Sequence, residues 1–90
     1  MADKTSYDLT ITPAAKRDLR KLRGNLIVLK SIDQTIQGLS KNPRPSGIEK
    51  LSNGSFRVRD GSYRILFDID DKNLIVEIKR VRDRKEVYRH

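Results

Sequence analysis

The stretch FRVRDGSYRILFDIDDKNLIVEIKR, residues 56–80, consists of three β-prone runs separated by two turn-forming sequences. The runs are residues 56–59, 63–69 and 74–80, which are rich in the β-branched and aromatic residues that strands favour. The sequences DGS and DDKN between them are typical of tight turns. Three strands joined by short turns predict an antiparallel β-meander.

The residues before this stretch predict a strand followed by a short helix. Residues 7–11 alternate in the manner of a strand, and Thr12-Pro13 resembles a helix N-cap followed by proline at the first helical position. Gly24-Asn25 is expected to end this helix. The helix has a narrow apolar stripe made of Ala15, Leu19 and Leu22, and its other faces carry Lys16, Arg17, Arg20, Lys21 and Arg23.

A second helix is expected over residues 26–39, because apolar residues recur there at helical spacing. Its apolar side consists of Leu26, Leu29, Ile32, Ile36 and Leu39. Residues 40–47, SKNPRPSG, are predicted to form an ordered connector and not a continuing helix. The whole chain, residues 1–90, is expected to be one α+β domain: an N-terminal strand at one sheet edge, a two-helix hairpin and a meander, with the helices packed on one face of a twisted sheet.

The composition limits the possible partners and sites. Twenty Lys and Arg residues against twelve Asp and Glu give a net charge of +8, which attracts polyanions and makes nucleic acid the first candidate partner. The absence of cysteine excludes disulfides, a thiolate nucleophile and zinc sites that need sulfur ligands. Without a signal peptide or a long apolar run, the sequence predicts a cytoplasmic protein.

Positive charge is expected to gather on one face of the predicted sheet. If Phe56 and Val58 face the core, the alternation of a strand turns Arg57 and Arg59 away from it, and Arg64 joins them if the turn keeps register. Like charges on adjacent strands repel one another, which favours a phosphate ligand over an ordinary solvated face. Further polar residues follow on this face and in the tail: Glu77, Lys79, Arg82, Arg84, Lys85, Tyr88, Arg89 and His90.

The usual catalytic groupings are mostly missing. The sequence contains no Ser-His-Asp order, no phosphate-binding glycine loop and no metal-spaced histidine pair. The single histidine, His90, is the last residue, where fraying is more common than service as a general base. Tyr88 either packs against the sheet or acts on a substrate, and the residues alone favour neither role.

Four motifs together resemble the signature of the RelE/ParE toxin superfamily, and specifically its RelE branch. They are NPRP at 42–45, RVR at 57–59, GSYR at 61–64 and RKEVY at 84–88, and the resemblance covers residues 7–88. It implies a fold similar to small microbial ribonucleases and a RelB-like antitoxin that wraps and neutralises the toxin. It also implies ribosome-dependent cleavage of messenger RNA in the A site by metal-free attack of the ribose 2′-hydroxyl, with no cofactor.

The resemblance also implies roles for individual residues. Arg64 would stabilise the charge that develops on the phosphoryl oxygens. Residues that would bind the RNA are Arg57, Arg59, Lys79, Lys85 and Arg89. The tail would supply a second catalytic arginine, which is Arg82 or Arg84 depending on how the spacing is counted, and Tyr88 would orient or activate the 2′-hydroxyl. Many relatives have histidine where this chain has Asp83, so the general base stays open.

Two other functions remain possible at this point. A ParE-like toxin would bind DNA gyrase and block replication without nuclease activity, and fold alone does not separate it from a nuclease. A non-toxic module would persist only as a binding partner of the antitoxin. The clustered arginines favour the nuclease, because gyrase inhibition does not require a phosphate site.

Overall fold

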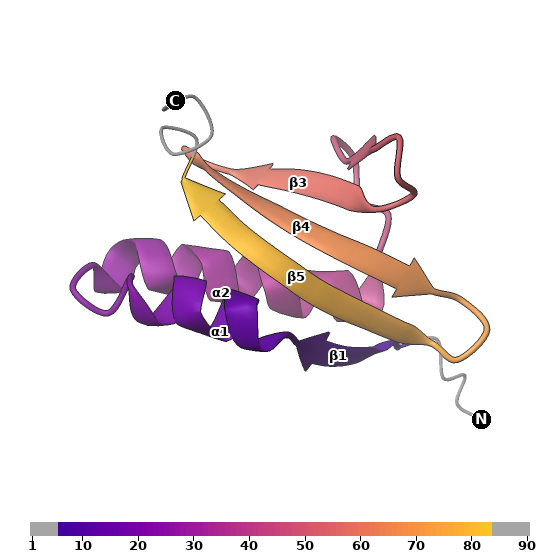
Figure 1. Cartoon of the computed structure of the whole chain (residues 1–90), viewed down its shortest axis with the longest axis horizontal. Coiled ribbons are helices and arrows are strands. Elements are labelled where there is room, and N and C mark those ends of the chain that lie inside the picture. The colour runs from indigo at the N-terminus through magenta and orange to yellow at the C-terminus, as the bar shows by residue number, and fades with distance from the viewer. Residues whose placement is uncertain (1–5, 84–90) are drawn as a thin grey trace.

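The chain folds into a five-stranded sheet with two helices on one of its faces (Figure 1). The computed structural model describes residues 6–83. The elements are β1 (Asp8–Ile11), α1 (Pro13–Arg20), α2 (Leu26–Lys41), β2 (Glu49–Lys50), β3 (Phe56–Asp60), β4 (Tyr63–Asp70) and β5 (Ile75–Asp83). The strand order is β1-β5-β4-β3-β2. The predicted strand, helical hairpin and meander are therefore confirmed, and β1 lies at one edge as expected.

The helices begin where the sequence predicts. The Thr12 side chain accepts a hydrogen bond from the backbone N–H of Ala15 at 3.1 Å, and Asn25 caps α2 by accepting from Val28 at 3.3 Å. The predicted end of the second helix at residue 39 is wrong by two residues, because α2 continues through Ser40 to Lys41. Ser40 exchanges backbone and side-chain hydrogen bonds with Tyr7, just before β1, and these contacts stabilise the extra residues in helical form.

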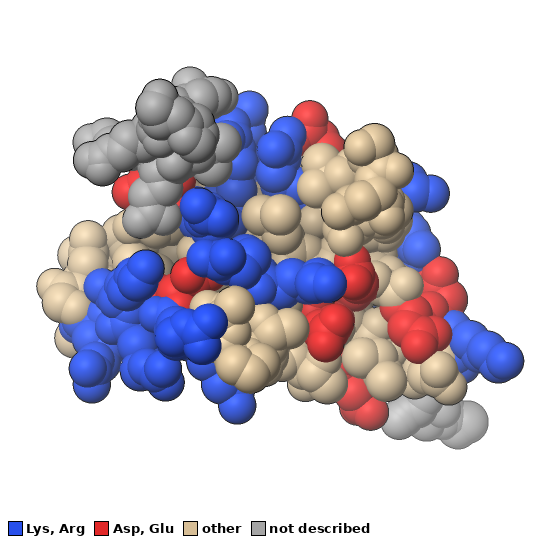
Figure 2. Space-filling view, in the orientation of Figure 1, with Lys and Arg blue, Asp and Glu red and all other residues tan. Residues whose placement is uncertain are grey.

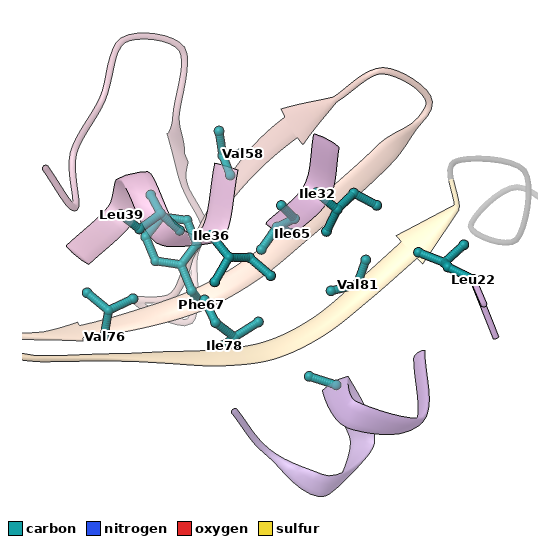
Figure 3. Close-up of a cluster of buried hydrophobic side chains, with 11 residues drawn as sticks. Leu22, Ile32, Ile36, Leu39, Val58, Ile65, Phe67, Val76, Ile78 and Val81 are labelled. Atoms are coloured by element: carbon teal, nitrogen blue, oxygen red, sulfur yellow. The ribbon is translucent and has the colours of Figure 1, made fainter. Parts of the chain in front are cut away.

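The hydrophobic core lies between the helices and the sheet (Figure 3). Its fully buried large side chains are Phe67, Ile32, Ile36, Leu39, Ile65, Ile78 and Val76. The prediction that Leu26 joins this core is wrong, since its side chain is 70% exposed. Leu26 is the first residue of α2, whereas the buried residues of this helix are Ile32, Ile36 and Leu39. The Leu26 side chain therefore lies outside the core, although its spacing is that of a core residue. Neither described helix combines the length and apolar content needed to span a membrane.

The sheet differs from the predicted meander in four respects. β1 pairs parallel with β5, while the other neighbouring strands pair antiparallel. β2 is a two-residue strand that was not predicted, and β5 extends to Asp83, beyond the predicted end at residue 80. A β-bulge interrupts the β4–β5 pair: Leu66 lies opposite Arg80 and Phe67 opposite Ile78, which leaves Lys79 without a cross-strand partner. The bulge allows Ile78 and Val81, three residues apart, to face the same core.

Candidate functional site

Three arginines lie side by side across the three central strands, at the end of the sheet next to the β3–β4 turn. Arg59 on β3 is directly opposite Arg64 on β4, and Arg64 is directly opposite Arg82 on β5. The neighbouring positions Val58, Ile65 and Val81 are all buried toward the helices, so alternation places the three arginines on the opposite face. We call these three residues the arginine row. The predicted grouping of Arg59 with Arg64 is confirmed, and Arg82, one of the two candidates for the second catalytic arginine, lies beside Arg64 on β5.

The members of the arginine row differ in burial. Arg64, in the middle, is only 6% exposed, whereas Arg82 is partly buried and Arg59 is exposed. Directly opposite residues in an antiparallel pair have Cα atoms about 4.5–5.5 Å apart, so the row concentrates charge within a small area. A guanidinium held in a desolvated position interacts more strongly with an anion than the same group in water. Arg64 therefore has the surroundings that stabilisation of a developing negative charge requires.

A carboxylate that the sequence analysis missed lies next to this row. Glu49 on β2 is directly opposite Arg57 on β3, and its Oε1 accepts a hydrogen bond from Arg57 Nε at 2.9 Å and a second from the same guanidinium. These bonds from Arg57, followed by the attraction of Arg57, Arg59 and Arg64, hold the pKa of the Glu49 carboxyl below its ordinary value. Glu49 is thus an internal anion that occupies Arg57 and competes with a phosphate for it. Its only signal in the sequence is that no other acidic residue occurs between positions 44 and 59.

A second missed residue, Asp18, ties α1 to the strand that carries Arg82. Asp18 is 7% exposed; its Oδ2 accepts from the backbone N–H of Val81 and from Arg80 Nε, both at 2.8 Å. Burial acts to raise the pKa of this carboxyl, but the hydrogen bonds from Arg80 and Val81 outweigh it and the pKa is lowered. An acidic residue three positions after Ala15, inside the apolar stripe, is the signal that could have revealed it.

Lys79, another predicted site residue, lies outside the arginine row. Lys79 lies in the β-bulge, and its Nζ is 3.5 Å from Asp68 Oδ2 on β4. Its predicted contact with RNA would therefore be separate from the row. Arg84, Lys85, Tyr88, Arg89 and His90 lie outside the described residues. Within residues 6–83, no cluster of three or more His, Cys, Asp or Glu side chains is arranged to hold a metal ion.

The arrangement has a definite chemical capacity. Each guanidinium can form two parallel hydrogen bonds to phosphate oxygens and keeps its charge at any physiological pH. Two or three such groups in one line, with Arg64 desolvated between the others, can bind a phosphodiester and stabilise the additional charge of a pentacovalent transition state. The described part of the site thus fits phosphoryl chemistry on a polyanion.

Comparison with known proteins gives a consistent family. The model of the family described as "ParE toxin of type II toxin-antitoxin system, parDE" matches residues 9–88. The chain is 34% identical over 85 residues to Toxin RelG of Mycobacterium tuberculosis, covering 92% of this chain and 97% of that protein. It is also 34% identical over 92 residues to Toxin RelE of the same organism, covering 99% and 93%.

Solved structures share the fold. The toxin–antitoxin complex RelBE2 from Mycobacterium tuberculosis matches with a TM-score of 0.76 and 33% identity, covering 93% of this chain and 98% of that one. The archaeal RelE–RelB complex from Pyrococcus horikoshii matches with a TM-score of 0.73 at 17% identity, covering 88% and 96%. The ParDE system of Pseudomonas aeruginosa has a TM-score of 0.73 at 14% identity, covering 89% and 98%. At these last two identities the likeness concerns the fold alone.

Proposed function

The chain belongs to the RelE/ParE superfamily of type II toxin–antitoxin toxins, and from this we propose that it is an endoribonuclease that cleaves messenger RNA in the ribosomal A site. The arginine row supports the proposal, with Arg64 buried at its centre. A toxin that acts only by binding gyrase has no need for a desolvated guanidinium flanked by two more. Two relatives that are 34% identical to the chain are named Toxin RelG and Toxin RelE, which favours the same choice.

The proposed reaction needs no group beyond the RNA and the protein. The ribose 2′-oxygen attacks the adjacent phosphorus, the bond from phosphorus to the 5′-oxygen breaks, and the products are a 2′,3′-cyclic phosphate and a free 5′-hydroxyl. The 2′-hydroxyl proton leaves and the departing 5′-oxygen gains one. Arg64 stabilises the charge on the non-bridging oxygens, with Arg82 beside it as a candidate second catalytic arginine, while Arg57 and Arg59 bind the flanking backbone. Arg84 and Tyr88 are proposed to complete the site, and Lys79, Lys85 and Arg89 to extend the RNA contact.

Positioning is expected to supply much of the rate. Arginine and tyrosine have pKa values far above neutrality and are poor proton acceptors. Glu49 is ionised, but its lowered pKa makes it a weak base. If the ribosome holds the message in line for attack, effective molarity substitutes for a matched base. The isolated protein should therefore cut free RNA negligibly.

We also propose a RelB-like antitoxin as the partner that neutralises the protein. The similar RelBE2 and RelE–RelB structures are toxin–antitoxin complexes. On this chain Leu26 and Ile27 are 70% and 84% exposed at the start of α2, and such side chains are commonly covered by a partner. The net charge of +8 fits an acidic antitoxin segment. The complex would form in the cytoplasm around one toxin domain spanning residues 1–90.

Primer extension on programmed ribosomes tests the nuclease directly. A defined message is compared without protein, with wild-type protein and with Arg64→Ala. We expect a new 5′ end inside the A-site codon with wild type, and a loss of about 100-fold or more in the cleavage rate with Arg64→Ala, as for removal of a group that stabilises the transition state. An intact message with the folded wild-type protein would reject the proposal.

The order in which protein synthesis and DNA synthesis stop distinguishes the nuclease from a ParE-like gyrase inhibitor. Induction of the protein in cells should stop incorporation of labelled amino acids before incorporation of thymidine. The reverse order would favour gyrase as the target, and growth without any arrest would favour a non-toxic antitoxin-binding module.

A further inference from the structure

The first helix carries a second concentration of positive charge, separate from the arginine row. Lys16, Arg17, Arg20, Lys21 and Arg23 are exposed on α1 and the turn that follows it. Figure 2 shows cations gathered at the lower left, over α1 and the adjoining loop. Within residues 6–83, the ion pairs all involve other cations. We call these five residues the α1 basic face.

The α1 basic face is not explained by the stability of the helix. Cations in the last turn, such as Arg17 and Arg20, interact favourably with the helix dipole, but Lys16 lies near the start of the helix, where a cation is unfavourable. Lys16 and Arg20 are also four residues apart, as are Arg17 and Lys21, and like charges at that spacing repel. The one acidic residue of α1 is Asp18, which is buried and already binds Arg80. Asp18 also attracts Lys21, but within residues 6–83 no ion pair offsets the repulsion between Lys16 and Arg20.

We propose that the α1 basic face binds the phosphate backbone of double-stranded RNA, so that α1 docks structured RNA while the arginine row holds the single strand that is cut. This inference rests on the proposed nuclease function for its biological setting. Lys16 and Arg20 form one row of cations, and Arg17 and Lys21 form a second. The two residues of each row are about one helical turn, or about 6 Å, apart along the helix axis, which offers a rigid array to regularly placed phosphates. Surfaces for single-stranded RNA usually add aromatic side chains on which bases stack, and residues 12–25 contain none.

The polarity of this face also favours RNA over an acidic protein. The centre of a protein interface is depleted of charge and enriched in aromatic and apolar residues, whereas nucleic-acid interfaces are polar and strongly positive. The apolar side chains of α1, Ala15 and Leu19, turn inward. Exposed apolar residues are found instead at Leu26 and Ile27, in the next helix.

The two surfaces are held in a fixed relation to each other. The hydrogen bond from Val81 N–H to Asp18 connects α1 to the residue next to Arg82. Lys21 of the α1 basic face also lines a hollow of about 220 Å³ together with Tyr63 and Asp83, which are adjacent in sequence to Arg64 and Arg82. The arginine row lies on the opposite face of the sheet, so a duplex bound on α1 would set the position of a strand that passes around the end of the sheet to the row.

The test compares two double variants of the full-length protein with equal net charge. Lys16→Gln/Lys21→Gln alters the α1 basic face and keeps a good helix former at both positions. Lys41→Gln/Lys72→Gln removes two exposed lysines elsewhere. Binding of a short fluorescein-labelled RNA duplex is measured by anisotropy over a range of salt concentrations, with a labelled single strand and poly-L-glutamate as further probes. We expect the first variant to bind the duplex roughly ten-fold more weakly, with little change for the control. The slope of log affinity against log salt concentration, called the salt slope below, should become shallower by about 0.9 for each phosphate contact that is lost.

Two outcomes of the binding comparison would overturn the proposal. Equal weakening by the two variants would mean that only net charge matters, and unchanged duplex binding with loss of poly-L-glutamate would assign the face to an acidic protein. On ribosomes, the α1 variant should raise KM for cleavage and leave kcat unchanged. If the wild-type protein cuts nothing, the nuclease proposal fails while the duplex comparison still decides this one.

Discussion

Arg59 on β3 and Arg64 on β4 are directly opposite each other, so two like charges face one another on the same side of the sheet. Such a cross-strand pair destabilises a sheet relative to a neutral pair. Glu49 offsets part of this repulsion because it attracts both Arg59 and Arg64, and a bound phosphate would add a second anion near the pair.

Arg59→Gln should separate stability from RNA binding. Removal of one charge from the pair should leave the free energy of unfolding unchanged or raise it by about 0.2–1 kcal/mol. The same change should lower the salt slope for single-stranded RNA by about 0.7, the value for one lost contact. Urea unfolding and RNA titrations measure the two effects. A clear loss of stability would show that Arg59 has a structural role.

Glu49→Gln should strengthen RNA binding. The carboxylate holds Arg57 through two hydrogen bonds, and its neutral replacement should release that guanidinium for phosphate. We expect higher affinity and a salt slope steeper by about 0.7. Glu77→Gln removes the same charge from β5 and is the matched control. An equal gain in both variants would trace the effect to net charge alone.

Asp18→Asn should destabilise the protein by about 1–3 kcal/mol, because the amide lacks the negative charge that Arg80 contacts and its NH2 group cannot accept one of the hydrogen bonds that Oδ1 and Oδ2 receive. The lowered pKa of Asp18 means that its stabilising effect is present above the pKa of the unfolded chain and is lost as pH falls through the folded value. The difference between wild type and variant should shrink over that acidic range. Thermal unfolding across pH measures this, with the exposed Asp33→Asn as control.

The Asp71 carboxyl should titrate unusually low. Hydrogen bonds from Arg44, and then from Tyr7, lower its pKa from 3.8 to about 2. Arg44→Gln should raise that pKa toward the ordinary value, while Lys72→Gln should change it little. NMR titration of the side-chain carboxyl provides the measurement. An ordinary pKa in the wild-type protein would mean that this contact among the N-terminus, the connector and the β4–β5 turn does not form in solution.

Leu74→Gly should raise stability. Leu74 has a φ of 54° in the β4–β5 turn, a left-handed conformation that costs a side chain about 1–2 kcal/mol. Glycine removes this strain but adds freedom to the unfolded chain, so we expect a net gain of about 0.5–1 kcal/mol. Leu74→Ala keeps the strain and should bring no gain. Denaturant unfolding of the two variants tests whether the backbone, and not the side chain, is responsible.

Local patterns predicted much of this fold. The Thr12-Pro13 cap and the alternation that turns Arg59 away from the core depend on neighbouring residues only, and the structure has both. Asp18 and Glu49 were missed because their importance comes from partners on other elements, Val81 and Arg57. Such pairings arise from tertiary packing and have no fixed spacing in the sequence.

Two other differences have the same kind of origin. The bulge at Lys79 changes the alternation of β5, which a strict two-residue period does not anticipate. Leu26 has the apolar periodicity of a core residue but lies beyond the surface that α2 covers. The start of each helix could be read from its N-cap, but not its end: α1 ends at Arg20, before the predicted end at Gly24-Asn25, and α2 continues to Lys41.

The position of β5 between β1 and β4 has a consequence for synthesis of the protein. Among the described strands β1 is translated first and β5 last, yet β1 reaches the rest of the sheet only through β5. Arg59 and Arg64 likewise precede Arg82, the third member of their row. A nascent chain released before β5 has been made would contain two of the three members of the arginine row and no complete sheet to hold them. The topology thus links assembly of the site to completion of the final described strand.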